Sequence, residues 1–191
     1  GIVLPSHFTE RKITDPSTAR DAINDVADTL GIVSVEDELG TADCSTVLGD
    51  TYYSFPQVYR GIPVYGRKVT VSADAGSEAA LLTSGFYPIE NLSVEAKITQ
   101  NDAEKIVAVL YPGEADIYVN NLVIFSLDKT NPELAWKISV HQNNSWESVF
   151  LSAVDGRALK TFSNELTDNE SSSNRFTNVY LYNCLLYTSP S

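Results

Sequence analysis

The chain has 191 residues, of which 43% are hydrophobic and 20% charged, so it holds enough apolar material for one ordinary domain or two small ones. Its formal net charge of −12 would repel a nucleic-acid backbone or an anionic membrane surface, so neither is an expected partner. No stretch reaches the roughly 18 apolar residues that a membrane-spanning helix needs, so we expect no membrane association.

The first predicted helix covers residues 16–30. Asp15 followed by Pro16 is typical of an N-cap and a first helical residue, and apolar side chains then recur at helical spacing as far as Gly31. After this helix we expect a short strand at 32–38 and a polar loop at 40–49.

Extended structure is expected between residues 52 and 83, because apolar and polar residues there begin to alternate. The pattern predicts strands at 52–59, 64–73 and 79–83, with turns at 60–61 and 74–76. Alternation would place Tyr53, Phe55 and Tyr59 on one side, which we interpret as a core face rather than a binding surface. Residues 86–91 are expected to form a connector.

The same order of elements then repeats. Thr99 and Asp102 form a capping-box pair before an apolar helical face that runs to Leu110 and stops at Pro112. Strands are predicted at 116–126, 134–140, 146–154 and 158–162. Two helix-then-strand units predict an α+β fold of two consecutive modules, each a helix packed on an antiparallel β-sheet. Residues 163–174 are too polar to bury and indicate a flexible linker.

Catalytic chemistry finds little support in this sequence. A zinc peptidase needs two histidines one helical turn apart with a glutamate between them, and neither His7 nor His141 has such a partner. The carboxylates at 36–38 are interpreted as a solvated turn, and whether Cys44 pairs with Cys184 stays open. We therefore predict that the chain is not an enzyme and holds no cofactor.

The first hairpin carries a motif. Its residues 55–66 read Phe-Pro-Gln-Val-Tyr-Arg-Gly-Ile-Pro-Val-Tyr-Gly, and Val-Thr-Val and Asp74 follow. This pattern resembles the pro-region module shared by fungalysins and thermolysin-like proteases. The resemblance singles out this hairpin as a candidate contact with an enzyme, through Gln57, Tyr59, Gly61, Ile62, Pro63, Val64 and Gly66.

The second unit resembles the PepSY module that follows the first module in such precursors. The likeness rests on 134–138, on 146–150 and on Asp-Gly-Arg-Ala-Leu at 155–159, and it implies a core of Trp136, Trp146, Asp155 and Gly156. Residues 151–154 depart from the usual small residue and aspartate. The expected domains are 1–90, 91–163 and a linker with tail at 164–191, in which 184–191 resembles translated adaptor sequence.

Together the two resemblances imply the pro-region of a secreted zinc metalloendopeptidase precursor, a zymogen. Such a segment acts as an intramolecular chaperone and temporary inhibitor of its cognate catalytic domain. That domain, with its H-E-x-x-H motif and zinc, is missing from this sequence, as is a signal peptide, so we expect a fragment. The alternatives are a stand-alone secreted PepSY-type protease inhibitor or binding module, and an enzyme of unrecognised type. Coding sequence downstream of Asn174 would separate the pro-region from the stand-alone inhibitor.

Overall fold

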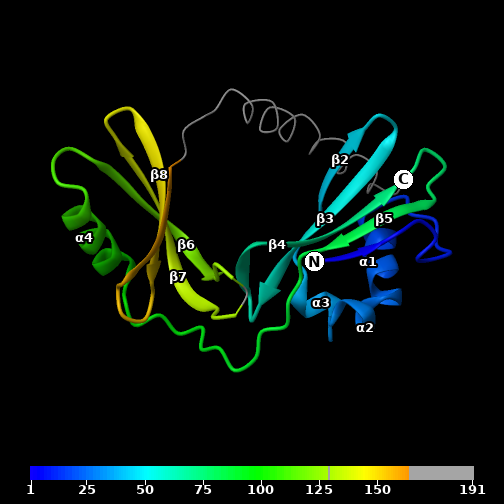
Figure 1. Cartoon of the computed structure of the whole chain (residues 1–191), viewed down its shortest axis with the longest axis horizontal. Helices are drawn as coiled ribbons and strands as arrows, with labels where there is room; N and C mark the ends of the chain where they lie inside the picture. Colours follow the sequence, from blue (N-terminus) through cyan, green and yellow to red (C-terminus); the bar gives the residue numbers. More distant parts are fainter. Residues whose placement is uncertain (129, 164–191) are drawn as a thin grey trace, which may run out of the picture. The chain divides into compact units, whose positions relative to one another are not determined.

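The computed structural model describes residues 1–128 and 130–163. It is an α+β fold whose strands pair almost entirely antiparallel, as the sequence predicts (Figure 1). The described residues form two compact units: the first comprises Gly1–Gly61 and Gly66–Pro88, and the second comprises Ile62–Tyr65 and 89–163. Each unit is described separately below.

The first helix of the first unit begins where the sequence predicts. Helix α1 (Pro16–Asp25) is capped by Asp15, whose Oδ1 accepts a hydrogen bond from the Thr18 amide at 2.7 Å, while Thr18 Oγ1 accepts from the Asp15 amide at 3.1 Å. The predicted single helix is broken at Val26, and α2 (Ala27–Leu30) completes it. Gly31 ends α2 in the left-handed conformation, with φ of 76°.

Two local predictions in this region are wrong. The expected strand at 32–38 contains a short helix, α3 (Val35–Glu38), because Ser34 Oγ accepts from the Asp37 amide at 3.2 Å and the Glu38 carboxylate accepts from the Ser34 amide at 2.9 Å. The expected polar loop at 40–49 contains strand β2 (Asp43–Val47). Most of β2 is exposed, so its composition is that of a solvated edge strand.

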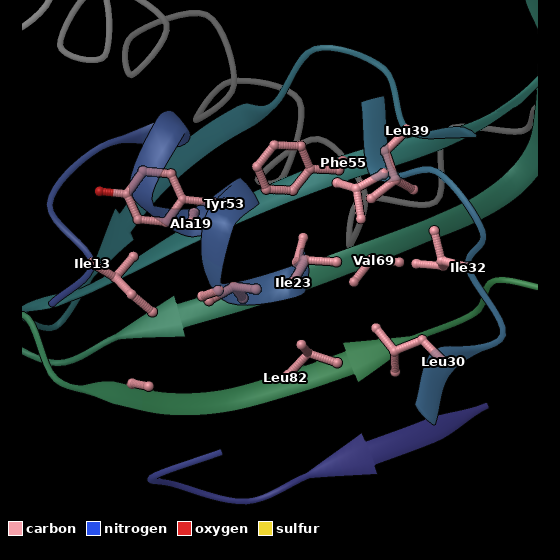
Figure 2. Close-up of a cluster of buried hydrophobic side chains, with 14 of the residues drawn as sticks. Ile13, Ala19, Ile23, Leu30, Ile32, Leu39, Tyr53, Phe55, Val69 and Leu82 are labelled. Carbon is pink, nitrogen blue, oxygen red and sulfur yellow. The ribbon is translucent and has the colours of Figure 1, made fainter. Parts of the chain in front are cut away.

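The sheet of the first unit has the order β1-β5-β4-β3-β2 and is antiparallel. Its strands are β1 (Ile2–Leu4), β2, β3 (Asp50–Tyr59), β4 (Ile62–Ala73) and β5 (Ala79–Ser84), although Ile62–Tyr65 of β4 belong to the second unit. The predicted turn between β3 and β4 is present, with positive φ at Arg60 and Gly61, 48° and 81°. Three helices cover one face, and Figure 2 shows Ile23 of α1 and Leu30 of α2 meeting Leu82 and Val69 of the sheet.

The second unit has one described helix, α4 (Gln100–Leu110), and four strands in sequential antiparallel order. Thr99 caps α4 as predicted, with Oγ1 accepting from the Asp102 amide at 3.1 Å. The strands are β6 (Asp116–Phe125), β7 (Glu133–Gln142), β8 (Ser145–Ser152) and β9 (Ala158–Ser163). On the other side of β6, Val64 pairs with Ile124 in parallel.

The two faces of this second sheet are packed differently. On one face, Ala103 and Val107 of α4 lie on Ile138, Val149 and their neighbours. The opposite face holds a smaller buried cluster of Val123, Phe125, Ala135 and Phe150. Leu110, which the sequence places on the apolar helix face, is exposed at the last residue of α4.

The predicted linker and tail at 164–191 lie outside the described residues. The predicted domain limits at 1–90 and 91–163 stay a prediction. The first unit is also more elaborate than the expected single helix on a sheet, since its described part has three helices.

Candidate functional site

Gln57 is the motif residue whose role the structure makes clearest. Its side chain is buried, with 2% of the residue exposed, and it binds the main chain of Tyr87 at both ends. Gln57 Nε2 donates to the Tyr87 carbonyl at 2.7 Å, and the Tyr87 amide donates to Gln57 Oε1 at 3.2 Å. Gln57 therefore attaches the connector after β5 to strand β3, and it is not available to a partner.

The rest of the predicted hairpin is partly buried. Val64 is buried in the second unit beside Ile124, and Tyr59 and Ile62 are half-buried. Gly61, Pro63 and Gly66 are exposed. Gly61 and Gly66 have φ of 81° and 69°, and an added Cβ would meet no atom within 4 Å at either position. These glycines therefore serve the backbone conformation, and a partner could reach only the exposed part of the hairpin.

Three of the four residues implied for the second module surround α4. Trp136 is half-buried, and its Nε1 donates to the Ile98 carbonyl at 2.8 Å, just before the helix. Gly156, with φ of 76°, lies against α4, since its Cβ would be 2.8 Å from Ile106 Cδ1. Asp155 is exposed and shapes the same turn, with Oδ1 accepting from the Arg157 amide at 2.9 Å, a bond that lowers its pKa.

Trp146 is not a core residue, which corrects the prediction. It is 43% exposed, and its ring lies 5.8 Å from that of Tyr118 and 4.8 Å from that of His141. The reason is register: the Asn143-Asn144 turn pairs Trp146 with His141, so Val149 and Leu151 occupy the helix-covered face and Trp146 the opposite one. The alternation of β8 does not reveal this exposure, because Trp146 shares its parity with the buried Phe150 and Ser152.

Trp146 belongs to a larger surface, which we call the open aromatic face. Phe125 and Phe150 form its buried floor, with ring centroids 4.3 Å apart. Tyr65 and Phe162 lie 4.5 Å and 5.8 Å from the Phe150 ring. The rings at its surface are exposed by 38% (Tyr65), 51% (Tyr118), 43% (Trp146) and 37% (Phe162). The sequence interpretation missed this face because it assigned aromatic residues on strands to the core.

Two lysines border these rings. Lys137 Nζ lies 5.5 Å from the centre of the Tyr65 ring, and Lys160 Nζ lies 5.7 Å from that of Phe162. His141 Nδ1 lies 3.5 Å from Asp116 Oδ2 at one end of the face. Within 1–128 and 130–163, no three His, Cys, Asp or Glu side chains gather where they could hold a metal ion. His7 is exposed at the other end of the chain.

A comparison with protein-family models finds a match that runs from β2 into β5 and includes the hairpin. Residues 43–82 match the Fungalysin/Thermolysin Propeptide Motif. The predicted resemblance of this segment is therefore confirmed. The propeptide motif ends within β5, and its matched segment includes Gln57, Val64 and both turn glycines. Such a motif belongs to a propeptide and not to a catalytic domain.

No curated protein matches the chain. Among solved structures, the Bacillus megaterium YpeB C-terminal domain is similar with a TM-score of 0.43 and 14% identity, over 81% of this chain and 69% of that one. A putative lipoprotein from Clostridium difficile 630 has a TM-score of 0.31 and 16% identity, over 84% of this chain and 99% of that one. Similarity at this level does not establish a shared function. The helices of the described residues are too short or too polar to cross a membrane.

Proposed function

We propose that the chain is the pro-region of a secreted zinc metalloendopeptidase precursor of the thermolysin-like kind. The observation that carries this proposal is the propeptide motif at residues 43–82. The proposal assigns residues 1–90 to the propeptide module, 91–163 to a PepSY-like module, and 164–191 to a linker and tail. Zinc and the catalytic residues would belong to the protease domain and not to this chain.

The proposed pro-region has two roles toward that domain, intramolecular chaperone and temporary inhibitor. A preformed surface that binds the native enzyme and not its unfolded chain stabilises the native state by mass action. If the same surface binds a folding intermediate, it also shields apolar groups that would otherwise aggregate. The well-packed core of each unit supports this proposal, because a rigid surface loses little conformational entropy on binding.

The deciding experiment begins with the uninterrupted gene. We expect an H-E-x-x-H helix to be encoded after residue 174, in the same frame. The encoded catalytic domain is then refolded from denaturant with and without the full chain added in trans, and peptidase activity is measured. A higher refolding yield, followed by inhibition of the refolded enzyme, is the expected result.

A stop codon directly after this chain would overturn the pro-region and favour the stand-alone inhibitor. In that case the purified chain should still inhibit a metalloprotease that the same organism secretes. Peptidase activity of the purified chain itself would overturn both.

A further inference from the structure

One face of the second unit's sheet has no described helix on it. Helix α4 covers the opposite side of strands β6 to β9 (Figure 1). The register aligns the uncovered side into rows that cross the strands: Asp116, His141 and Trp146; Tyr118, Ser139, Ser148 and Phe162; Asn121, Lys137, Phe150 and Lys160. The exposed rings therefore form two groups on the open aromatic face: Tyr118 lies beside Trp146, while Tyr65 and Phe162 lie against Phe150. Ser139 and Ser148 lie between Tyr118 and Phe162.

Four large exposed rings on one face of a sheet are uncommon on a surface that meets only water. Its floor is rigid, because Phe125 and Phe150 are buried and their rings are stacked. Tyr and Trp present a large contact area and have few rotamers to lose, which is why they dominate the energetic centres of interfaces. The open aromatic face thus has the composition and rigidity of a docking surface.

The charges on this face indicate the chemistry of its partner. Lys137 and Lys160 lie on the row that also contains Phe150, in a chain whose formal net charge is −12. Neither lysine is in a described ion pair with a carboxylate; each lies over a ring of the face instead. A partner that places carboxylates opposite these two ammonium groups, and apolar side chains over the rings, would be complementary.

The course of the chain indicates which partner this is. Strand β9 contributes Phe162 to the face and ends at Ser163, from which the chain continues. Any domain encoded further along the chain is therefore joined to the border of the open aromatic face through residues 164–191, and such a tether raises its effective concentration there. We propose that this face docks the catalytic domain of the precursor, an inference that rests on the proposed function.

The test compares face variants with matched variants on α4, the opposite side of the same sheet. The double variants are Tyr118→Ser with Trp146→Ser, and Lys137→Glu with Lys160→Glu. Their controls are Val109→Ser and Lys105→Glu, both at exposed helix positions. The inhibition constant of each full-length variant is measured against the mature catalytic domain encoded downstream. Thermal unfolding of every variant ensures that only folded protein is compared.

We expect each face variant to inhibit at least about tenfold more weakly than the wild type, since central aromatic and charged contacts carry most of an interface's binding free energy. The controls should change inhibition by less than about twofold, as peripheral substitutions usually do. If replacing a carboxylate of the enzyme by lysine restores tight inhibition by the lysine variant, that carboxylate lies opposite Lys137 or Lys160 in the complex.

The possible failures are distinct. If the wild-type chain does not inhibit, the proposed function fails. If it inhibits and the face variants inhibit equally well, docking at this face is wrong and the pro-region proposal survives. Sedimentation that shows a dimer of the wild type, lost in Tyr118→Ser with Trp146→Ser while inhibition is retained, would assign the face to a second copy of this chain and overturn the inference.

Discussion

Each unit has an antiparallel sheet with helices on one face, but the faces of the two sheets without a described helix carry different side chains. On the other face the first unit presents a row of hydroxyl side chains, with Ser54 Oγ 2.9 Å from Thr70 Oγ1 and Thr83 next, and the exposed aliphatic residues Val3 and Leu81 lie on the same face. The second unit presents the exposed rings of Tyr118, Trp146 and Phe162 on its uncovered face. The exposed rings of the second unit present more apolar area than the two aliphatic side chains of the first, so we place docking on the second unit.

The helices of the two units also differ in how much of the core they bury. Three helices bury a large core in the first unit. In the second, α4 buries only Ala103 and Val107, and part of the core lies on the opposite face around Phe150. The second unit therefore depends on packing against both sides of its sheet. Both tryptophans of the chain, Trp136 and Trp146, belong to this unit, so their fluorescence reports its unfolding.

The largest expected loss of stability tests whether the second unit depends on packing against both faces of its sheet. Phe150→Ala should lower the free energy of unfolding of the second unit by about 3–5 kcal/mol, because it removes a fully buried ring from three aromatic contacts. Ser54→Ala, on the corresponding face of the first unit, should cost less than about 1 kcal/mol. Urea unfolding followed by tryptophan fluorescence and circular dichroism measures both. Equal losses would remove the distinction between the two faces.

Gln57→Ala should come next, in the first unit. It removes both hydrogen bonds to the Tyr87 main chain from a buried site, which we expect to cost about 2–4 kcal/mol. The control is Gln100→Ala, whose exposed side chain makes one long bond to the Val119 carbonyl at 3.4 Å. The control should lose less than about 0.5 kcal/mol in the same unfolding assay. Loss of inhibition by Gln57→Ala with unchanged stability would instead make Gln57 an enzyme contact.

A smaller effect compares two glycines with left-handed φ. Gly66→Ala should cost about 1 kcal/mol from backbone strain alone, since its new Cβ meets no atom within 4 Å. Gly156→Ala should cost more, because its Cβ also meets Ile106 Cδ1. In an Ile106→Val background, which removes that atom, the two costs should converge in thermal unfolding. A Gly156→Ala cost that is unchanged by Ile106→Val would show that the turn does not lie against α4.

The smallest effects concern pH and differ between the units. Burial and a hydrogen bond to Glu147 raise the pKa of Tyr111 to about 12, so its contribution to the second unit's stability is lost as pH rises from 10 towards 12. In the first unit, hydrogen bonds from Arg11 and Thr9 lower the pKa of Asp25. Its contribution is present above the ordinary value of about 3.8 and is lost as pH falls through the lowered one.

These signs give matched variants. Tyr111→Phe should reduce the loss of second-unit stability at alkaline pH, measured by tryptophan fluorescence. Asp25→Asn should reduce the loss of first-unit stability at acid pH, measured by circular dichroism because both tryptophans lie in the second unit. Unfolding midpoints between pH 2.5 and 11.5 provide the measurement, with the limits approximated from ordinary Asp and Tyr pKa values. A Tyr111→Phe chain with the wild-type alkaline profile would contradict the assigned cause.

The sequence predicted the features that depend on local chemistry. The caps at Asp15 and Thr99 and the two-residue turns at Arg60-Gly61 and Asn143-Asn144 lie where they were expected, because each depends on neighbours within a few residues. Strand β2 and helix α3 were missed, since an exposed edge strand lacks apolar alternation and a four-residue helix lacks a periodic pattern.

The candidate site was harder to predict, because it depends on which strands pair. Gln57 reads as a surface residue until the connector at Tyr87 is placed beside it, 30 positions later. Trp146 reads as a core residue until register shows that it shares a face with His141. Composition describes a side chain, whereas exposure depends on pairing between distant segments.

The most direct test of the account is carbene footprinting of the full chain with and without the downstream catalytic domain, carrying its general-base glutamate as glutamine. We predict that labelling of Tyr118, Trp146 and Phe162 falls in the complex. Val3 and Leu81, exposed on the hydroxyl-lined face of the first unit, should be labelled equally in both states. Protection of Val3 and Leu81 with unchanged labelling of Trp146 would contradict the account.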